Sequence, residues 1–129
     1  TTANQKAAEA VASHSLPDIQ FSHILAGDIV ARKKPAPDIY LLALKKTGTD
    51  PSKCIVVEDS RNGMLAGDSA GVGVLVTTSL YTKDEEFDKA KLVVTCLGDE
   101  RGERGSIVLG PEIKGYEGIL SIEMLGTLI

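Results

Sequence analysis

The 129-residue sequence has no tryptophan and contains only two phenylalanines and three tyrosines. Proteins that bind single-stranded nucleic acid stack its bases on aromatic side chains, so this composition speaks against that class. Positive charge is not in excess either, because 14 Lys and Arg residues face 18 Asp and Glu residues for a net charge of −4. The chain therefore lacks the electrostatic signature of a protein that binds nucleic acid or an anionic membrane.

Long hydrophobic runs are also absent. No stretch approaches the roughly 18 apolar residues that span a bilayer, and the first residues show no secretory signal, so we expect no membrane insertion. The two cysteines, Cys54 and Cys96, show neither a C-x-x-C motif nor metal-ligand spacing. We expect both to be reduced structural thiols in a reducing compartment.

What the sequence does have is enough apolar content, 43%, for the core of a single domain. Apolar runs alternate with amphipathic segments that turn residues bound. Strands are expected at 21–26, 54–57, 74–76 and 92–94, and helices at 5–13, 37–47, 62–70 and 119–128. This alternation is typical of an α/β protein with a parallel sheet.

Local signals sharpen several of these elements. Thr2 or Asn4 caps the first helix, and Ser60 is expected to cap the third. Gly48 should end the second helix, whose apolar residues cover most of its circumference and predict a well-buried element. The run 54–57 predicts a strand buried on both faces, and the acidic segment 84–86 predicts a solvated helix start.

Two neighbouring acids, Glu58 and Asp59, follow the apolar run 54–57 directly. Parallel sheets bind ligands outside the carboxyl ends of their strands, which is where this pair falls. Adjacent carboxylates repel each other unless a cation lies between them, and Mg²⁺ is the usual solution. The pair is therefore a candidate magnesium site.

Two further sites could hold an anion. Lys34 lies in a basic loop that Pro35 and Pro37 stiffen, just before a helix N-terminus; a solvated basic turn is the alternative. Thr1 and Thr2 offer hydroxyls and backbone N–H groups that could bind phosphate oxygens at a helix start. Taken locally, a simple capping role explains these threonines better.

The order of these three sites resembles that of the haloacid dehalogenase (HAD) superfamily, in its β-phosphoglucomutase and CbbY-like branch. The resemblance rests on residues 33–40 (KKPAPDIY) and 57–63 (VEDSRNG). It implies a Rossmann-like three-layer α/β/α parallel sheet, with residues 1–99 forming a partial core. Residues 100–129, a glycine-rich segment and a C-terminal helix, are expected to close it.

The resemblance also implies a function, namely a Mg²⁺-dependent phosphohydrolase that acts on a small sugar phosphate or bisphosphate through an aspartyl-phosphate intermediate. Thr1 would hydrogen-bond the phosphoryl group with help from the backbone of Thr2, and Lys34 would neutralise phosphate charge. Glu58 and Asp59 would hold Mg²⁺. The partner would be a small phosphorylated metabolite.

One part of the family pattern is missing from the sequence. The family's nucleophilic aspartate lies in a D-x-D-G-T-type motif on its first strand, and no such motif occurs here. The first two strands and the cap would be missing with it, which implies a fragment that is inactive alone. We expect the N-terminal part of the same protein, or a partner chain, to complete the sheet between 21–26 and 54–57. Without it, lost hydrogen bonds and burial of on the order of 10 kcal/mol should prevent folding as a monomer.

Alternatives remain at this level. The chain could be a catalytically inactive HAD-derived subunit with a structural or docking role. A phosphoacceptor receiver domain also uses an acid pair and a lysine, but in the reverse chain order. Phosphatase and mutase are not distinguished, although 81–87 (YTKDEEF) slightly favours a sugar-bisphosphate phosphatase in the cytoplasm or a plastid.

Overall fold

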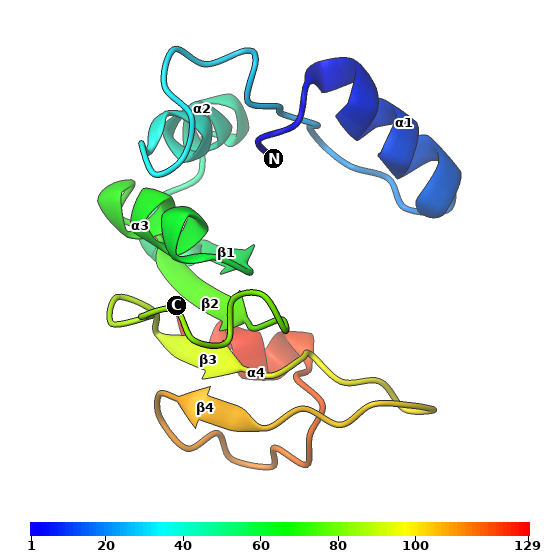
Figure 1. Cartoon of the computed structure of the whole chain (residues 1–129), viewed down its shortest axis with the longest axis vertical. Helices are drawn as coiled ribbons and strands as arrows, with labels where there is room; N and C mark the ends of the chain where they lie inside the picture. The colour runs from blue at the N-terminus through cyan, green and yellow to red at the C-terminus, as the bar shows by residue number, and fades with distance from the viewer.

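The structure is a computed structural model that describes all residues from Thr1 to Ile129. Two helices open the chain, helix and strand alternate from α2 to β2, and three successive strands precede the last helix (Figure 1). The helices are α1 (Gln5–Ser15), α2 (Asp38–Thr47), α3 (Arg61–Ser69) and α4 (Ile122–Gly126), and the strands are β1 (Ile55–Glu58), β2 (Gly73–Thr77), β3 (Leu92–Val94) and β4 (Ile107–Leu109). No helix is both long and apolar enough to cross a membrane.

The four strands form one sheet in the order β1-β2-β3-β4. The pairs β1/β2 and β2/β3 are parallel, with Glu58 beside Val76. The predicted α/β fold is therefore confirmed. β4 runs antiparallel to β3 and was not predicted, because three residues in a glycine-rich segment give too short a pattern.

Both faces of the sheet are covered, which gives three layers. On one face α3 packs over a core of Met64, Val74, Val76, Phe87 and Val93. On the other, α4 and the C-terminal segment pack over Leu75, Leu92, Val94, Ile113 and Leu128.

Several helix ends fall where local signals predict them. The side chain of Asn4, rather than Thr2, caps α1 by accepting a hydrogen bond from Ala7 N at 2.9 Å. Ser60 caps α3 through Gly63 N at 3.3 Å. Gly48 ends α2 in the left-handed conformation, with a φ of 66°.

The strand predicted at 21–26 is wrong. This segment pairs with no other strand, and its carbonyl groups bond to the start of the chain instead. The Thr1 amino group donates to Leu25 O at 3.3 Å, and Gln5 Nε2 donates to Ile24 O at 3.0 Å. An apolar segment forms a β-strand only when its backbone can hydrogen-bond to a neighbouring strand, and no strand of this structure lies beside residues 21–26.

Burial around β1 also differs from expectation. Val57 in β1 is 48% exposed, and in α2 only Ile39 is buried while Leu41 is 48% exposed. The reason is topological, since β1 is an edge strand of the sheet and its free edge has no neighbouring strand. The sequence shows which residues are apolar, but the position of β1 at the sheet edge determines how far their side chains are buried.

Two predicted helical segments are shorter or absent. Residues 84–86 form no helix, since Asp84 lies in a turn, Glu85 in a bend and Glu86 in irregular backbone. The closing helix spans only Ile122–Gly126, because Ser121 caps it through Met124 N at 3.2 Å and so starts it late. Both cysteines, Cys54 and Cys96, are free thiols.

Candidate functional site

Glu58 is the centre of the site at the carboxyl end of β1. It is the last residue of the strand, and its side chain is 8% exposed. Its Oε1 accepts hydrogen bonds from the ammonium group of Lys34 and from the hydroxyl of Tyr40. The structure thus brings two predicted site residues, Lys34 and Glu58, into a nearly buried ion pair.

Lys34 lies in the loop before α2, and contacts between this loop and α2 hold it in place. The Lys34 ammonium lies 5.1 Å from the centre of the Tyr40 ring, a cation–π geometry. The loop is closed by Arg32, whose guanidinium pairs with Asp38 Oδ1 at 2.8 Å. The hydrogen bond from Arg32 lowers the pKa of Asp38, and the nearby positive charge adds to this effect. Lys34 is therefore positioned rather than trailing in solvent, against the alternative of a solvated turn.

Gly63 makes room for the Glu58 carboxylate in the first turn of α3. A Cβ atom at Gly63 would lie 1.9 Å from Glu58 Oε2, so any side chain there would displace the acid. From β2, the Thr77 hydroxyl reaches the Glu58 carbonyl oxygen at 3.5 Å. Both the side chain and the backbone of Glu58 are fixed by their surroundings.

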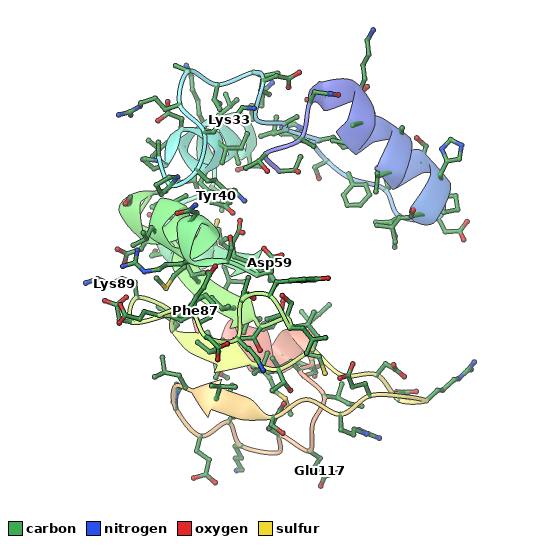
Figure 2. The ribbon with its side chains drawn as sticks, in the orientation of Figure 1. Lys33, Tyr40, Asp59, Phe87, Lys89 and Glu117 are labelled. Carbon is green, nitrogen blue, oxygen red and sulfur yellow. The ribbon has the colours of Figure 1, made fainter.

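Asp59 differs from its neighbour. It is exposed, and its side chain makes no hydrogen bond or ion pair. Figure 2 shows it where β1 leads into α3, below Tyr40 of α2. One acid of the pair is therefore committed to a lysine, and the other is free.

The donor set suits Mg²⁺. Carboxylate oxygens are its preferred protein ligands, and Mg²⁺ is commonly held by one or two carboxylates together with water and substrate phosphate. No group of three or more His, Cys, Asp or Glu residues lies within reach of a common metal ion. Within these 129 residues, a cation at Glu58 and Asp59 would therefore find no third protein ligand of these types.

Thr1 lies near the Lys34–Glu58 pair. Its backbone nitrogen is partly buried and lies near the charges of Lys34 and Glu58. The hydroxyl oxygen of Thr1 accepts a hydrogen bond from Ala3 N at 3.2 Å. Thr1 and Tyr40 also line one cavity of about 350 Å³. The side chain of Thr2 is exposed, and its backbone packs against Gly27.

Several other polar residues take structural roles. Asp28 accepts hydrogen bonds from Gln5 N at 3.0 and 3.1 Å and so stabilises the start of α1. His14 and His23 are exposed and contact backbone carbonyl groups. Tyr40 and Gly63 were missed as site residues although both lie in the quoted motifs. Only their spacing from Lys34 and Glu58 could have drawn attention to them.

Comparisons with known proteins agree with this geometry. Residues 1–71 match the model of a hydrolase family, the haloacid dehalogenase-like hydrolases. A CBBY-like protein of Arabidopsis thaliana is 48% identical over 106 residues, which cover 81% of this chain and 33% of the relative. Protein CbbY of Rhodobacter capsulatus is 49% identical over 70 residues, or 54% of this chain and 31% of the relative. The chain thus spans about a third of the length of these relatives.

Solved structures give the same picture. CbbY from Rhodobacter sphaeroides, crystallised with xylulose-(1,5)bisphosphate and separately with phosphate, matches with a TM-score of 0.66 and 40% identity. The match covers 72% of this chain and 43% of that structure. With more than half of its residues matched by the family model, the chain belongs to the haloacid dehalogenase-like hydrolase family.

Proposed function

We propose that this chain supplies part of the active site of a Mg²⁺-dependent phosphohydrolase that acts on a small sugar phosphate or bisphosphate. The observation that carries the proposal is the Lys34–Glu58 pair at the carboxyl end of β1, with the free carboxylate of Asp59 next to it. A phosphate needs positive charge around its oxygens, and a lysine beside a two-carboxylate cation site provides both sources of it.

Each residue has a defined role in this proposal. The Lys34 ammonium neutralises charge on the phosphoryl group and the attacking carboxylate. The Thr1 hydroxyl and the Thr2 backbone N–H bind phosphoryl oxygens, and Glu58 and Asp59 hold Mg²⁺. Bound Mg²⁺ supplies charge neutralisation at the phosphoryl oxygens.

The nucleophile is proposed to be an aspartate outside these 129 residues, since they contain no D-x-D-G-T motif. Its carboxylate attacks phosphorus while the bond from phosphorus to the sugar oxygen breaks, which gives an aspartyl phosphate. Water then cleaves this intermediate and releases phosphate. The names of relatives favour a phosphatase over a mutase, since they include an FMN phosphatase and a probable pseudouridine-5'-phosphatase.

We propose that a further strand pairs with the free edge of β1. An apolar groove of about 390 Å³ runs along this edge between α2 and β1, lined by Ala43, Leu44, Val56, Val57 and Val72 among others. Such an edge is a template for strand addition. The strand would come from the remaining part of the same protein or from a partner chain. The plant relative favours the plastid stroma or the cytoplasm as the compartment.

A catalytically inactive docking subunit is the second candidate, and the missing nucleophile motif is what favours it. The exposed, unpaired Asp59 counts against it, because a purely structural role gives no reason to keep a second acid beside Glu58. Phosphate release by the full protein, measured with and without a substitution of Asp59, separates the phosphohydrolase from the docking subunit.

In the full protein that carries this chain, Asp59→Ala should abolish Mg²⁺-dependent phosphate release from a sugar bisphosphate. Asp68→Ala is the matched control, because Asp68 is also an exposed acid and lies on α3, away from the end of β1. Unchanged turnover in Asp59→Ala would overturn the metal assignment. A folded wild-type protein that releases no phosphate would favour the docking subunit.

A further inference from the structure

One backbone amide at the start of α3 donates its hydrogen bond to a residue far along the chain and not to the capping residue Ser60. The first amides of a helix have no partner within the helix. Ser60 takes the amide of Gly63, whereas the amide of Arg61 donates to Glu85 Oε2 at 2.5 Å. A carboxylate at this position is also favoured by the helix dipole. Glu85 is 24 residues further along the chain, in the connection from β2 to β3.

The connection presents Glu85 through a tightly bonded turn. Ser79 N donates to Thr82 Oγ1 at 3.0 Å, and Lys83 N donates to Ser79 O at 2.9 Å. Glu85 N then donates to Thr82 O at 3.0 Å. These hydrogen bonds all lie between residues 79 and 85 and hold the backbone of this turn in one conformation.

Phe87 anchors the other end of the same turn. It is 8% exposed and packs with Met64 of α3 and with β2 and β3 residues in the core. Figure 2 shows Phe87 between α3 and the sheet. The segment 79–87 is thus attached to the sheet at both ends and to α3 in the middle.

We infer that Glu85 is a positioning residue for the acid pair and acts through the first turn of α3. Gly63 in this turn lies directly against the Glu58 carboxylate, and Asp59 lies two residues before the amide that Glu85 holds. A shift of the first turn would therefore move both acids. The inference rests on the proposed function, because it assigns Glu85 a part in setting the affinity of the same acids for Mg²⁺.

The test must separate positioning from bulk negative charge. In the full protein, Glu85→Ala removes charge and acceptor together, whereas Glu85→Gln removes charge but keeps an acceptor oxygen. Glu86→Ala removes an exposed charge from the same segment and leaves the acceptor of the Arg61 amide, Glu85, in place. Mg²⁺ titration by calorimetry should show binding about ten-fold weaker in Glu85→Ala, with Glu85→Gln and Glu86→Ala within about three-fold of wild type.

A second measurement does not depend on the metal. Amide hydrogen exchange at Arg61 should accelerate in Glu85→Ala and stay slow in Glu85→Gln. Unchanged exchange in Glu85→Ala overturns the inference, as does a Mg²⁺ affinity equal to that of Glu86→Ala. A wild-type protein that binds no Mg²⁺ overturns the proposed function instead, so the two failures are read by different measurements.

Discussion

The hydroxyl of Tyr40 is the second hydrogen-bond donor to the Glu58 carboxylate, beside Lys34, and its ring supports the Lys34 ammonium. One side chain thus contacts both members of the ion pair. Each hydrogen bond that a buried carboxylate accepts stabilises it. A hydrogen bond to a charged group contributes about 1.5–3 kcal/mol to the stability of the folded protein. Tyr40 should therefore contribute to stability as well as to the geometry of the site.

Tyr40→Phe tests this contribution because it removes the hydroxyl and keeps the ring. We expect the free energy of unfolding to fall by about 1–2 kcal/mol in urea denaturation of the full protein. Tyr81→Phe is the control, since Tyr81 is 95% exposed and should change stability by less than about 0.5 kcal/mol. Equal effects of the two substitutions would contradict the assigned role.

The sequence predicted part of this site and not the rest. Lys34, Glu58 and Asp59 were predicted because charged residues at a strand end or in a proline-stiffened loop need an explanation by themselves. Tyr40 has no such local signal, since a tyrosine in an apolar helix is most simply a core residue. Its role arises only when folding brings α2 beside the end of β1.

At the scale of elements, the close approach of α3 to β1 depends on Gly63. Gly63→Ala should destabilise the protein by about 1–3 kcal/mol through overpacking against Glu58, although alanine is the better helix former. Gly126→Ala in α4 is the control, because a Cβ there meets nothing within 4 Å. Both variants are compared by thermal denaturation of the full protein, in which Gly126→Ala should be neutral or slightly stabilising. Equal midpoints for Gly63→Ala and Gly126→Ala would contradict the packing argument.

The loop before α2 should show a specific pH response. The Arg32 hydrogen bond holds the pKa of Asp38 below its ordinary value of 3.8. The Arg32–Asp38 contribution is thus present above about pH 4 and is lost as the pH falls through the lowered pKa. In Arg32→Ala, NMR titration should show the Asp38 pKa raised toward its ordinary value. The pKa of Asp50, lowered by the Ser52 hydroxyl, should not move; a parallel shift there would contradict a local cause.

The elements themselves were predicted unevenly. β3 has the predicted bounds, and Ser60 and Gly48 mark real helix ends, because these signals are local. The segment 21–26 has the composition of a strand but no ladder partner, and pairing is a property of the whole sheet. β4 is too short to leave a periodic pattern.

At the scale of the whole molecule, the chain covers little of its own apolar surface. Only 21 of 129 residues are buried, and α1 contains none of them. Exposed apolar residues lie on α1, in the segment that follows it, on α2 and on β1, as in Val11, Phe21, Leu41 and Val57. Burial on this scale offsets little of the conformational entropy that folding removes.

We therefore expect the isolated 129-residue chain not to fold as a stable monomer. Circular dichroism should show no cooperative thermal transition for the purified chain at low concentration, whereas the full protein should show one. A cooperative transition in the isolated chain would refute this expectation.

The ion pair between Lys34 and Glu58 has a consequence for the order of events in the site. Each group is at present the counter-ion of the other. A cation that takes Glu58 frees Lys34 for an anion, and a phosphate that takes Lys34 frees Glu58 for a cation. The two ligands should therefore bind with positive cooperativity, and linkage requires each to tighten the other by the same factor.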